Sequence, residues 1–500
     1  MNSEQRSGNI MDDTGTAGAG PVGDAASAGA SVTGGVIPRP VIGLLIMGRK
    51  RPGFDPEWGA AVKKRIMGRV AALPGNGQPW RVVTPSDNIA DGTELGRAVE
   101  TCRREGVTTI VVVQPTISDG RLAPLLSRLW EKPLVLWATT EKPAGAMISA
   151  NSLVGTHVMG ATLRQLGHPL EILFGDPDDE TTVARLIQAI RSVHAAGAIH
   201  GKVYGLIGYH APGFVDFHTD PVFLNDTLGA QLYHLNTPEL VDRVHGYTTE
   251  ELAVEIAAFE ALGIPEGPEF AAALTAAGTT RDEAIAMQGR YYRAFRDYFA
   301  EEHFDALAFR CWPDLPTMVG HWPYFALARL VSEGFPIAME GDIDGAICSR
   351  IAESAGIGPV YLSDWLEHDR DSITIWHTGA APLQLSEPIG SPGGPRLGVQ
   401  FNNKRPTVLE STIRADRPVT VFRLWRYDGE YHMTALEGRT EKPKRELMAT
   451  NGRFVTDAVD VRDWFEEMVQ VGMPHHLCVI PGHHGDTLRR VARMSGMEWV

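Results

Sequence analysis

The first 350 residues alternate short apolar runs with longer segments of helical spacing. Residues 41–46, 108–113 and 134–137 are almost continuously apolar, which is typical of strands that helices cover on both faces. The segments between these runs place apolar residues three and four positions apart. Because strands that alternate with helices form parallel sheets through right-handed crossovers, this pattern predicts an α/β fold.

Two α/β units are expected. The first has predicted strands at residues 41–46, 80–83, 108–113, 134–137 and 171–174, with helices near 58–73, 92–105 and 181–197. The second has predicted strands at residues 202–208, 306–309 and 336–339, with helices near 249–261, 280–300, 324–332 and 344–353.

The pattern becomes mostly β after about residue 358. Strands are expected at residues 360–362, 372–377, 408–413, 419–425 and 432–437, with a hairpin turn at Asp428–Gly429 and helices near 461–470 and 486–494. The predicted organisation is therefore a disordered tail at 1–37, α/β domains at 38–198 and 199–357, and a barrel-like or sandwich β domain at 358–500. The tail is rich in Gly, Ala, Ser and Thr, so it buries too little apolar area to offset the entropy of ordering.

Composition and charge narrow the functional classes. The net charge of −15 is spread along the chain, whereas nucleic-acid binding needs a basic surface, so no nucleic acid is expected as a partner. No run of 18 apolar residues predicts a membrane span, and the first residues lack a secretory signal. The four cysteines form no CxxC pair, which favours free thiols in a reducing compartment. We therefore expect a cytoplasmic protein.

Carboxylates follow two consecutive strands of the second α/β unit. Asp314 comes shortly after the strand at 306–309, and Glu340 and Asp342 come directly after the strand at 336–339. Since ligands bind beyond the carboxyl ends of parallel strands, these acids are expected to face one cleft. The alternative is a plain strand-to-helix turn in which Asp342 caps the next helix.

The segment ALARLVSEGFPIAMEGD, residues 326–342, resembles the central motif of the L-fucose/L-arabinose isomerase superfamily. The preceding Cys-Trp-Pro-Asp at 311–314 and the His-His pair at 475–476 support the resemblance, which covers about residues 38–500. It implies two Rossmann-like α/β domains with parallel sheets, followed by a mostly β C-terminal domain. It also implies a homo-oligomer with sites near subunit interfaces.

The resemblance further implies a site in which two acids and a C-terminal histidine hold a manganese ion, with Mg²⁺ or Co²⁺ as alternatives. The first acid corresponds to Asp314, where the superfamily often has Glu. The second is Glu340 or Asp342, and the histidine is His476. In this superfamily the same acids act as ligand and base, so Asp314, Glu340 and Asp342 are also the catalytic candidates.

The chemistry of an aldose–ketose isomerase fits this residue set. The reaction moves a proton between C1 and C2, and a divalent ion that polarises the substrate oxygens stabilises the cis-enediol intermediate. A carboxylate beside the bound sugar can carry the proton.

The sequence leaves more than one substrate open. The chain also resembles the members of this superfamily that isomerise sulfoquinovose to sulfofructose, which we take as the leading hypothesis. A neutral aldose such as L-fucose or L-arabinose is the rival, and a non-catalytic sugar-binding protein is the alternative of another class. A sulfonate requires Arg or Lys donors. The candidate substrate-binding residues are Arg49, Arg51, Arg310, Trp312, His368, His377, Lys404, Arg405 and His483.

Overall fold

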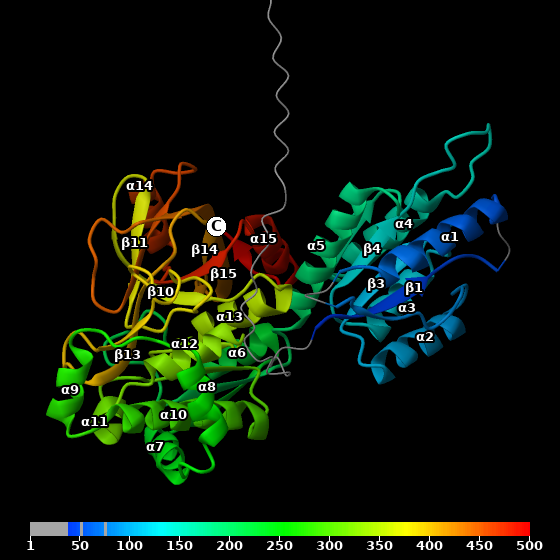
Figure 1. Ribbon diagram of the computed structural model, residues 1–500. Coiled ribbons are helices and arrows are strands. Elements are labelled where there is room, and N and C mark those ends of the chain that lie inside the picture. The colour runs from blue at the N-terminus through cyan, green and yellow to red at the C-terminus, as the bar shows by residue number, and fades with distance from the viewer. Residues whose placement is uncertain (1–38, 51–53, 75–77) are drawn as a thin grey trace, which may run out of the picture. The chain divides into compact units, whose positions relative to one another are not determined.

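The computed structural model describes residues 39–50, 54–74 and 78–500. The expected tail and Arg51 lie outside these residues. Three sheets organise the described chain: two parallel sheets and one mostly antiparallel sheet that closes into a barrel (Figure 1). This is the predicted fold class, α/β with a barrel-like C-terminal region.

The first sheet has five parallel strands in the order β2-β1-β3-β4-β5. Helices α1 and α5 pack on one face through apolar side chains, and α2, α3 and α4 cover the other face. The bounds are β1 Val41–Ile46, α1 Pro56–Ala71, β2 Arg81–Val83, α2 Gly92–Arg104, β3 Thr109–Gln114, α3 Leu122–Leu129, β4 Leu134–Ala138, α4 Ser152–Gln165, β5 Leu170–Phe174 and α5 Glu180–Gly197.

The second sheet has four parallel strands in the order β7-β6-β8-β9. Strand β7 was not expected from the sequence, and it forms an edge of this sheet with polar residues among its apolar ones. The bounds are β6 Val203–Ile207, α6 Pro221–Leu228, β7 Gln231–Leu235, α7 Thr237–Gly246, α8 Ala253–Ala261, α9 Phe270–Ala277, α10 Arg281–Glu301, β8 Ala306–Phe309, α11 Leu315–Val319, α12 Tyr324–Ser332, β9 Ile337–Ala338 and α13 Ile343–Ala355.

The third sheet contains a closed antiparallel barrel. Its strands follow the order β16-β11-β10-β17-β14-β15, and pairing of β15 with β16 completes the ring. The bounds are β10 Tyr361–His368, β11 Ser372–His377, β12 Arg396–Val399, β13 Pro406–Thr412, β14 Pro418–Tyr427, β15 Glu430–Glu441, β16 Thr450–Val455, α14 Val461–Gln470, β17 His476–Pro481, α15 Gly485–Met494 and β18 Glu498–Trp499.

The barrel packs directly on the second α/β unit. Helix α13 contacts the barrel strands β14 and β17, and buried residues of both parts belong to one hydrophobic core. The carboxyl end of β9 therefore lies against the barrel, next to strand ends that carry polar residues. No helix within the described residues has the length and apolar character needed to cross a membrane.

Candidate active site

The turn after β9 holds Glu340 in a strained conformation. Glu340 has a φ of +63° and Gly341 a φ of +81°, so two successive residues are left-handed. A side chain at Gly341 would meet the Tyr209 carbonyl oxygen at 2.3 Å, which explains the glycine. The Ala211 amide donates to the Glu340 carbonyl oxygen at 2.8 Å. Non-glycine residues in this region are costly and concentrate at functional sites.

Four ligand-type atoms converge beside this turn: Glu340 Oε2, Asp364 Oδ1, His377 Nε2 and His476 Nε2. His476 Nε2 lies 3.3 Å from the Glu340 oxygen and 3.4 Å from the Asp364 oxygen. His377 Nε2 lies 4.0 Å and 3.8 Å from the same two oxygens. Both imidazole nitrogens are buried without a hydrogen-bond partner. We call these four residues the carboxylate–histidine cluster.

The barrel supplies three of the four members from neighbouring strands. Asp364 lies on β10 directly opposite His476, the first residue of β17. On its other side β10 pairs with β11, where Asp364 faces Trp376 and His377 follows. Antiparallel pairing brings opposite side chains on one face within reach of each other, so the register of β10 with β17 places Asp364 beside His476.

Asp342 does not face the cluster but supports it. Its two oxygens accept hydrogen bonds from Arg423 at 2.7 and 2.8 Å, and Oδ2 also accepts from His476 Nδ1 at 2.9 Å. Oδ1 caps α13 by accepting from the Gly345 amide. Because Asp342 occupies Nδ1, the other nitrogen of His476 is directed at the cluster, the arrangement typical of metal-ligating histidines.

Charge within the site favours a cation. Burial alone would raise the pKa of Asp364, but His377 and His476 lower it to about 2. Burial alone would also raise the pKa of Glu340, but the nearby His476 and the charge of His377 outweigh burial and lower this pKa. The pKa of His476 is raised well above its usual value despite burial, because Nδ1 is hydrogen-bonded to Asp342 and the carboxylates of Asp364 and Glu340 lie close to Nε2. Two ionised carboxylates therefore face two imidazoles.

A cavity of about 350 Å³ adjoins the cluster, a volume in the range of small-molecule sites. The Trp312 indole nitrogen donates to Glu340 Oε1 at 2.7 Å, which leaves Oε2 for the cluster. The wall is largely aromatic, with amide side chains. Its lining residues are Phe214, Trp312, Pro313, Pro316, Trp322, Tyr324, Glu340, Asp364, Trp376, His377, Thr378, Gln400, Phe401, Asn402 and Asn403.

Asp314 is not brought to the cluster, contrary to the sequence-based expectation. Its carboxylate forms an ion pair with Arg310, four residues earlier, and its side chain is 39% exposed. Both residues line a separate pocket with Tyr209 and Met318, whereas Trp312 between them lines the 350 Å³ cavity. The physical reason is local: the guanidinium at the strand end neutralises the carboxylate at the start of α11.

The other predicted substrate-binding residues have varied positions. Trp312 and His377 line the cavity, and the Arg405 guanidinium donates to the carbonyl oxygen of Pro316 in its wall. The rest lie elsewhere: Arg49 is exposed in the first α/β unit, His368 accepts from Trp365, Lys404 pairs with Glu269, and His483 contacts the Gly438 carbonyl oxygen.

Asp364 is the site residue that sequence analysis missed. The expected strand at 360–362 stopped before it, although β10 continues to His368. The available signal was a Ser-Asp pair that interrupts an apolar run without an accompanying Gly or Pro, which is consistent with polar side chains that face a site.

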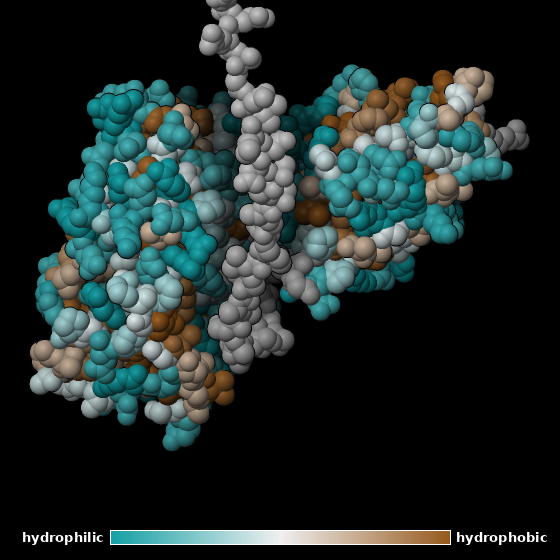
Figure 2. All heavy atoms as spheres, turned by 45° about the horizontal axis from the view of Figure 1, so that its top comes forward, coloured by the Kyte–Doolittle hydropathy of each residue, from teal (hydrophilic) through white to brown (hydrophobic). Residues whose placement is uncertain are grey.

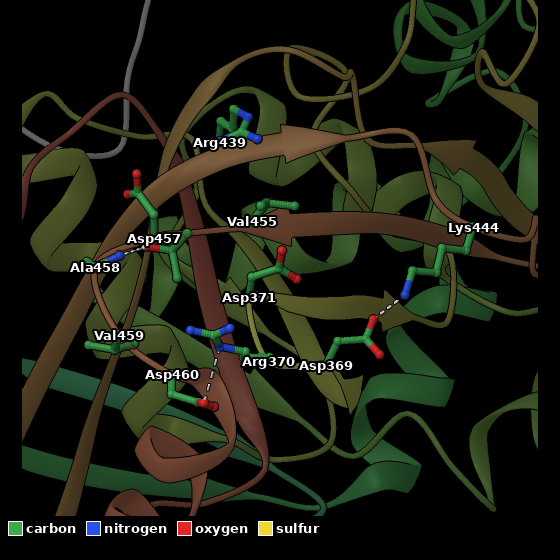
Figure 3. Close-up of a pocket in the computed structure, with 11 residues that line it drawn as sticks. Asp369, Arg370, Asp371, Arg439, Lys444, Val455, Asp457, Ala458, Val459 and Asp460 are labelled. Carbon is green, nitrogen blue, oxygen red and sulfur yellow. Dashed lines mark hydrogen bonds and ion pairs between the residues drawn. The ribbon is translucent and has the colours of Figure 1, made fainter.

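A larger, charged pocket of about 790 Å³ lies near the turn between β10 and β11 (Figure 3). Figure 3 shows two ion pairs among its charged groups, one between Lys444 and Asp369 and one between Arg370 and Asp460. Since these charges are neutralised locally and no member of the carboxylate–histidine cluster lines it, this pocket is not the candidate active site.

Comparison with known proteins indicates an aldose–ketose isomerase and supports the resemblance to L-fucose isomerase-like enzymes that the motifs carry. No family model matches the chain. The curated relatives that give this assignment are sulfoquinovose isomerases. The one from Priestia aryabhattai is 24% identical over 457 residues, covering 90% of this chain and 97% of the relative. Those from Alkalicoccus urumqiensis and Clostridium sp. (strain MSTE9) are each 28% identical, covering 78% of this chain and 85% of the relative.

Proposed function

We propose that this chain is a divalent-metal-dependent isomerase that converts sulfoquinovose to sulfofructose. The observation that carries the proposal is the carboxylate–histidine cluster, with two buried, unpartnered imidazole nitrogens, beside a cavity large enough for a sugar. The names of the curated relatives support the choice of substrate. A neutral aldose is the second candidate, since much of the cavity wall is aromatic.

Glu340, Asp364, His377 and His476 would hold the metal. Carboxylates and imidazoles together suit Mn²⁺, with Mg²⁺ or Co²⁺ as alternatives. When bound, the ion supplies Lewis-acid polarisation of the substrate oxygens. This ligand set replaces Asp314 and Asp342 of the sequence-based hypothesis with Asp364 and His377.

The protein's own residues carry the proton and orient the sugar. Glu340 and Asp364 are the carboxylates of the cluster, so one of them removes the proton from one substrate carbon and returns it to the neighbouring carbon through a cis-enediol. Trp312 fixes Glu340 by its hydrogen bond to Oε1, so the carboxylate does not rotate during the transfer. Aromatic side chains around the cavity exclude water from the reacting carbons.

A homo-oligomer is part of the proposal. Large apolar side chains are exposed on α4 and β5 of the first α/β unit and on the segments that flank α4, and Figure 2 shows hydrophobic residues gathered on this part of the surface. Exposed apolar patches on soluble proteins mark interaction sites. The residues concerned are Met147, Ile148, Leu153, Val154, Val158, Leu166, Ile172 and Phe174.

Solvent exchange tests the proposed function. The chelated protein is reloaded with Mn²⁺ and incubated in D₂O with sulfoquinovose, glucose, L-fucose or L-arabinose. We expect deuterium at C2 of sulfoquinovose and formation of sulfofructose, both abolished by chelation. Faster turnover of a neutral aldose would overturn the sulfosugar assignment, and binding without exchange would indicate a sugar-binding protein.

A further inference from the structure

We propose that Gln400 and Asn403 form the subsite that recognises the sulfonate group, an inference that rests on the proposed function. Both residues belong to the loop between β12 and β13, and both line the cavity that also contains Glu340 and Asp364. Gln400 is only 7% exposed, so its side chain is buried in this wall.

The amide of Gln400 has one free end. Its Oε1 accepts from the backbone amides of Asn402 and Asn403, at 2.7 and 2.8 Å. Since backbone amides only donate, the oxygen is identified by its partners. The Nε2 group has no hydrogen-bond partner among the described residues, and it can only donate.

Asn403 repeats this arrangement. Its Oδ1 accepts from the indole nitrogen of Trp322 at 3.2 Å and from the backbone amide of Arg405 at 3.1 Å. Both partners are donors only, so they identify Oδ1 as the acceptor. The Nδ2 group therefore has no hydrogen-bond partner in the part of the chain that the structure describes. Gln400 and Asn403 therefore form a donor wall: N–H groups are available there, while the amide oxygens are already in use.

A sulfonate complements the donor wall better than a hydroxyl does. A sulfonate has three acceptor oxygens and no donor, whereas a hydroxyl also carries a proton that needs an acceptor. The cavity's indole groups do not change this balance, because their N–H groups are engaged. Trp312 donates to Glu340, Trp322 to Asn403 and Trp376 to the Met448 carbonyl oxygen.

The guanidinium of Arg405 places a positive charge next to the donor wall. Arg405 follows the loop, and its guanidinium donates to the carbonyl oxygen of Pro316, a residue of the cavity wall. No carboxylate among the described residues forms an ion pair with Arg405, whereas the neighbouring Lys404 pairs with Glu269 at 3.1 Å. The unneutralised guanidinium favours an anionic group at this end of the cavity.

The test compares Gln400→Glu and Asn403→Asp with the wild type on sulfoquinovose and on glucose, which has a hydroxyl where sulfoquinovose has the sulfonate. Both substitutions keep the oxygen that accepts from the loop amides and replace the free donor by a negative acceptor. Lys404→Gln is the matched control, because it removes a positive charge from the same loop outside the cavity.

We expect each acidic variant to lose about 10-fold or more in kcat/KM for sulfoquinovose, mainly through KM, with a change of less than about 3-fold for glucose. The control should change neither. Equal losses on both sugars, or no loss on sulfoquinovose, would overturn the donor wall while leaving the isomerase intact. Failure of the Mn²⁺-loaded wild type to isomerise either sugar would instead refute the proposed function.

Discussion

At the residue scale, Glu340 and Asp342 of the Glu-Gly-Asp turn have different roles. Glu340 faces the cluster through Oε2, whereas Asp342 binds Arg423 and the far nitrogen of His476. The alternative that Asp342 caps the following helix also holds, because Gly345 donates to the same carboxylate. One carboxylate thus connects the start of α13, a buried arginine and a proposed ligand.

This arrangement predicts the effect of Asp342→Asn. The variant leaves the Arg423 guanidinium buried without a counter-charge, which should lower the free energy of unfolding by about 3 to 5 kcal/mol. Affinity for Mn²⁺ should fall about 10- to 100-fold because a neutral amide orients and polarises His476 less than the carboxylate does. Urea unfolding and equilibrium metal binding measure the two effects.

Asp344→Asn is the control for Asp342→Asn, since Asp344 lies in the first turn of the helix that Asp342 caps and pairs with Arg426 of β14 without contacting His476. A drop in stability with unchanged metal affinity in Asp342→Asn would contradict the orienting role.

Sequence analysis identified part of this residue set. Glu340 and His476 were predicted because they occupy motif positions and follow or begin apolar runs. Asp364 was not predicted, since its role depends on lying opposite His476 in a strand pair, which a single sequence does not reveal. Asp314 was expected at the cluster from its spacing after the strand end, whereas in the structure it pairs with Arg310, which depends on side-chain direction.

At the element scale, helix α13 carries a second feature besides its cap. Glu353, near its C-terminal end, is held close to the turns at Gly334 and Gly358, where added side chains would meet its carboxylate at 3.0 and 2.1 Å. Burial raises the pKa of Glu353 from 4.5 to about 7. The folded protein therefore binds this proton more tightly than the unfolded chain does.

The raised pKa predicts a pH-dependent stability. The contribution of Glu353 is fully present below about pH 4.5 and is lost as the pH rises through 7. The loss amounts to about 3 kcal/mol. Glu353→Gln should accordingly unfold at a higher urea concentration than the wild type at pH 8 and show little difference at pH 5. An equal difference at both pH values would contradict the assignment.

Most elements were predictable and their pairing was not. Every predicted strand and helix of the two α/β units occurs, with bounds shifted by a few residues, because continuous apolar runs and helical spacing are strong signals. Strands β16 and β17 were not expected. Their closure of the barrel pairs residues far apart in the sequence, such as β15 with β16 and β10 with β17.

At the scale of the whole molecule, the site is assembled from separate parts of the chain. Glu340 comes from the second α/β unit, and Asp364, His377 and His476 come from the barrel. The shared core through α13 holds these parts together. The central claim is that the carboxylate–histidine cluster forms the metal site and that Asp314, the acid after β8, does not belong to it.

Metal content of two single variants tests this claim most directly. Asp364→Asn and Asp314→Asn are each chelated, reloaded with Mn²⁺, and measured for metal bound per chain and for deuterium exchange at C2 of sulfoquinovose. We predict that Asp364→Asn loses most of its metal and at least about 100-fold of its exchange rate, while Asp314→Asn keeps wild-type metal content. Full metal content in Asp364→Asn together with metal loss in Asp314→Asn would contradict the account.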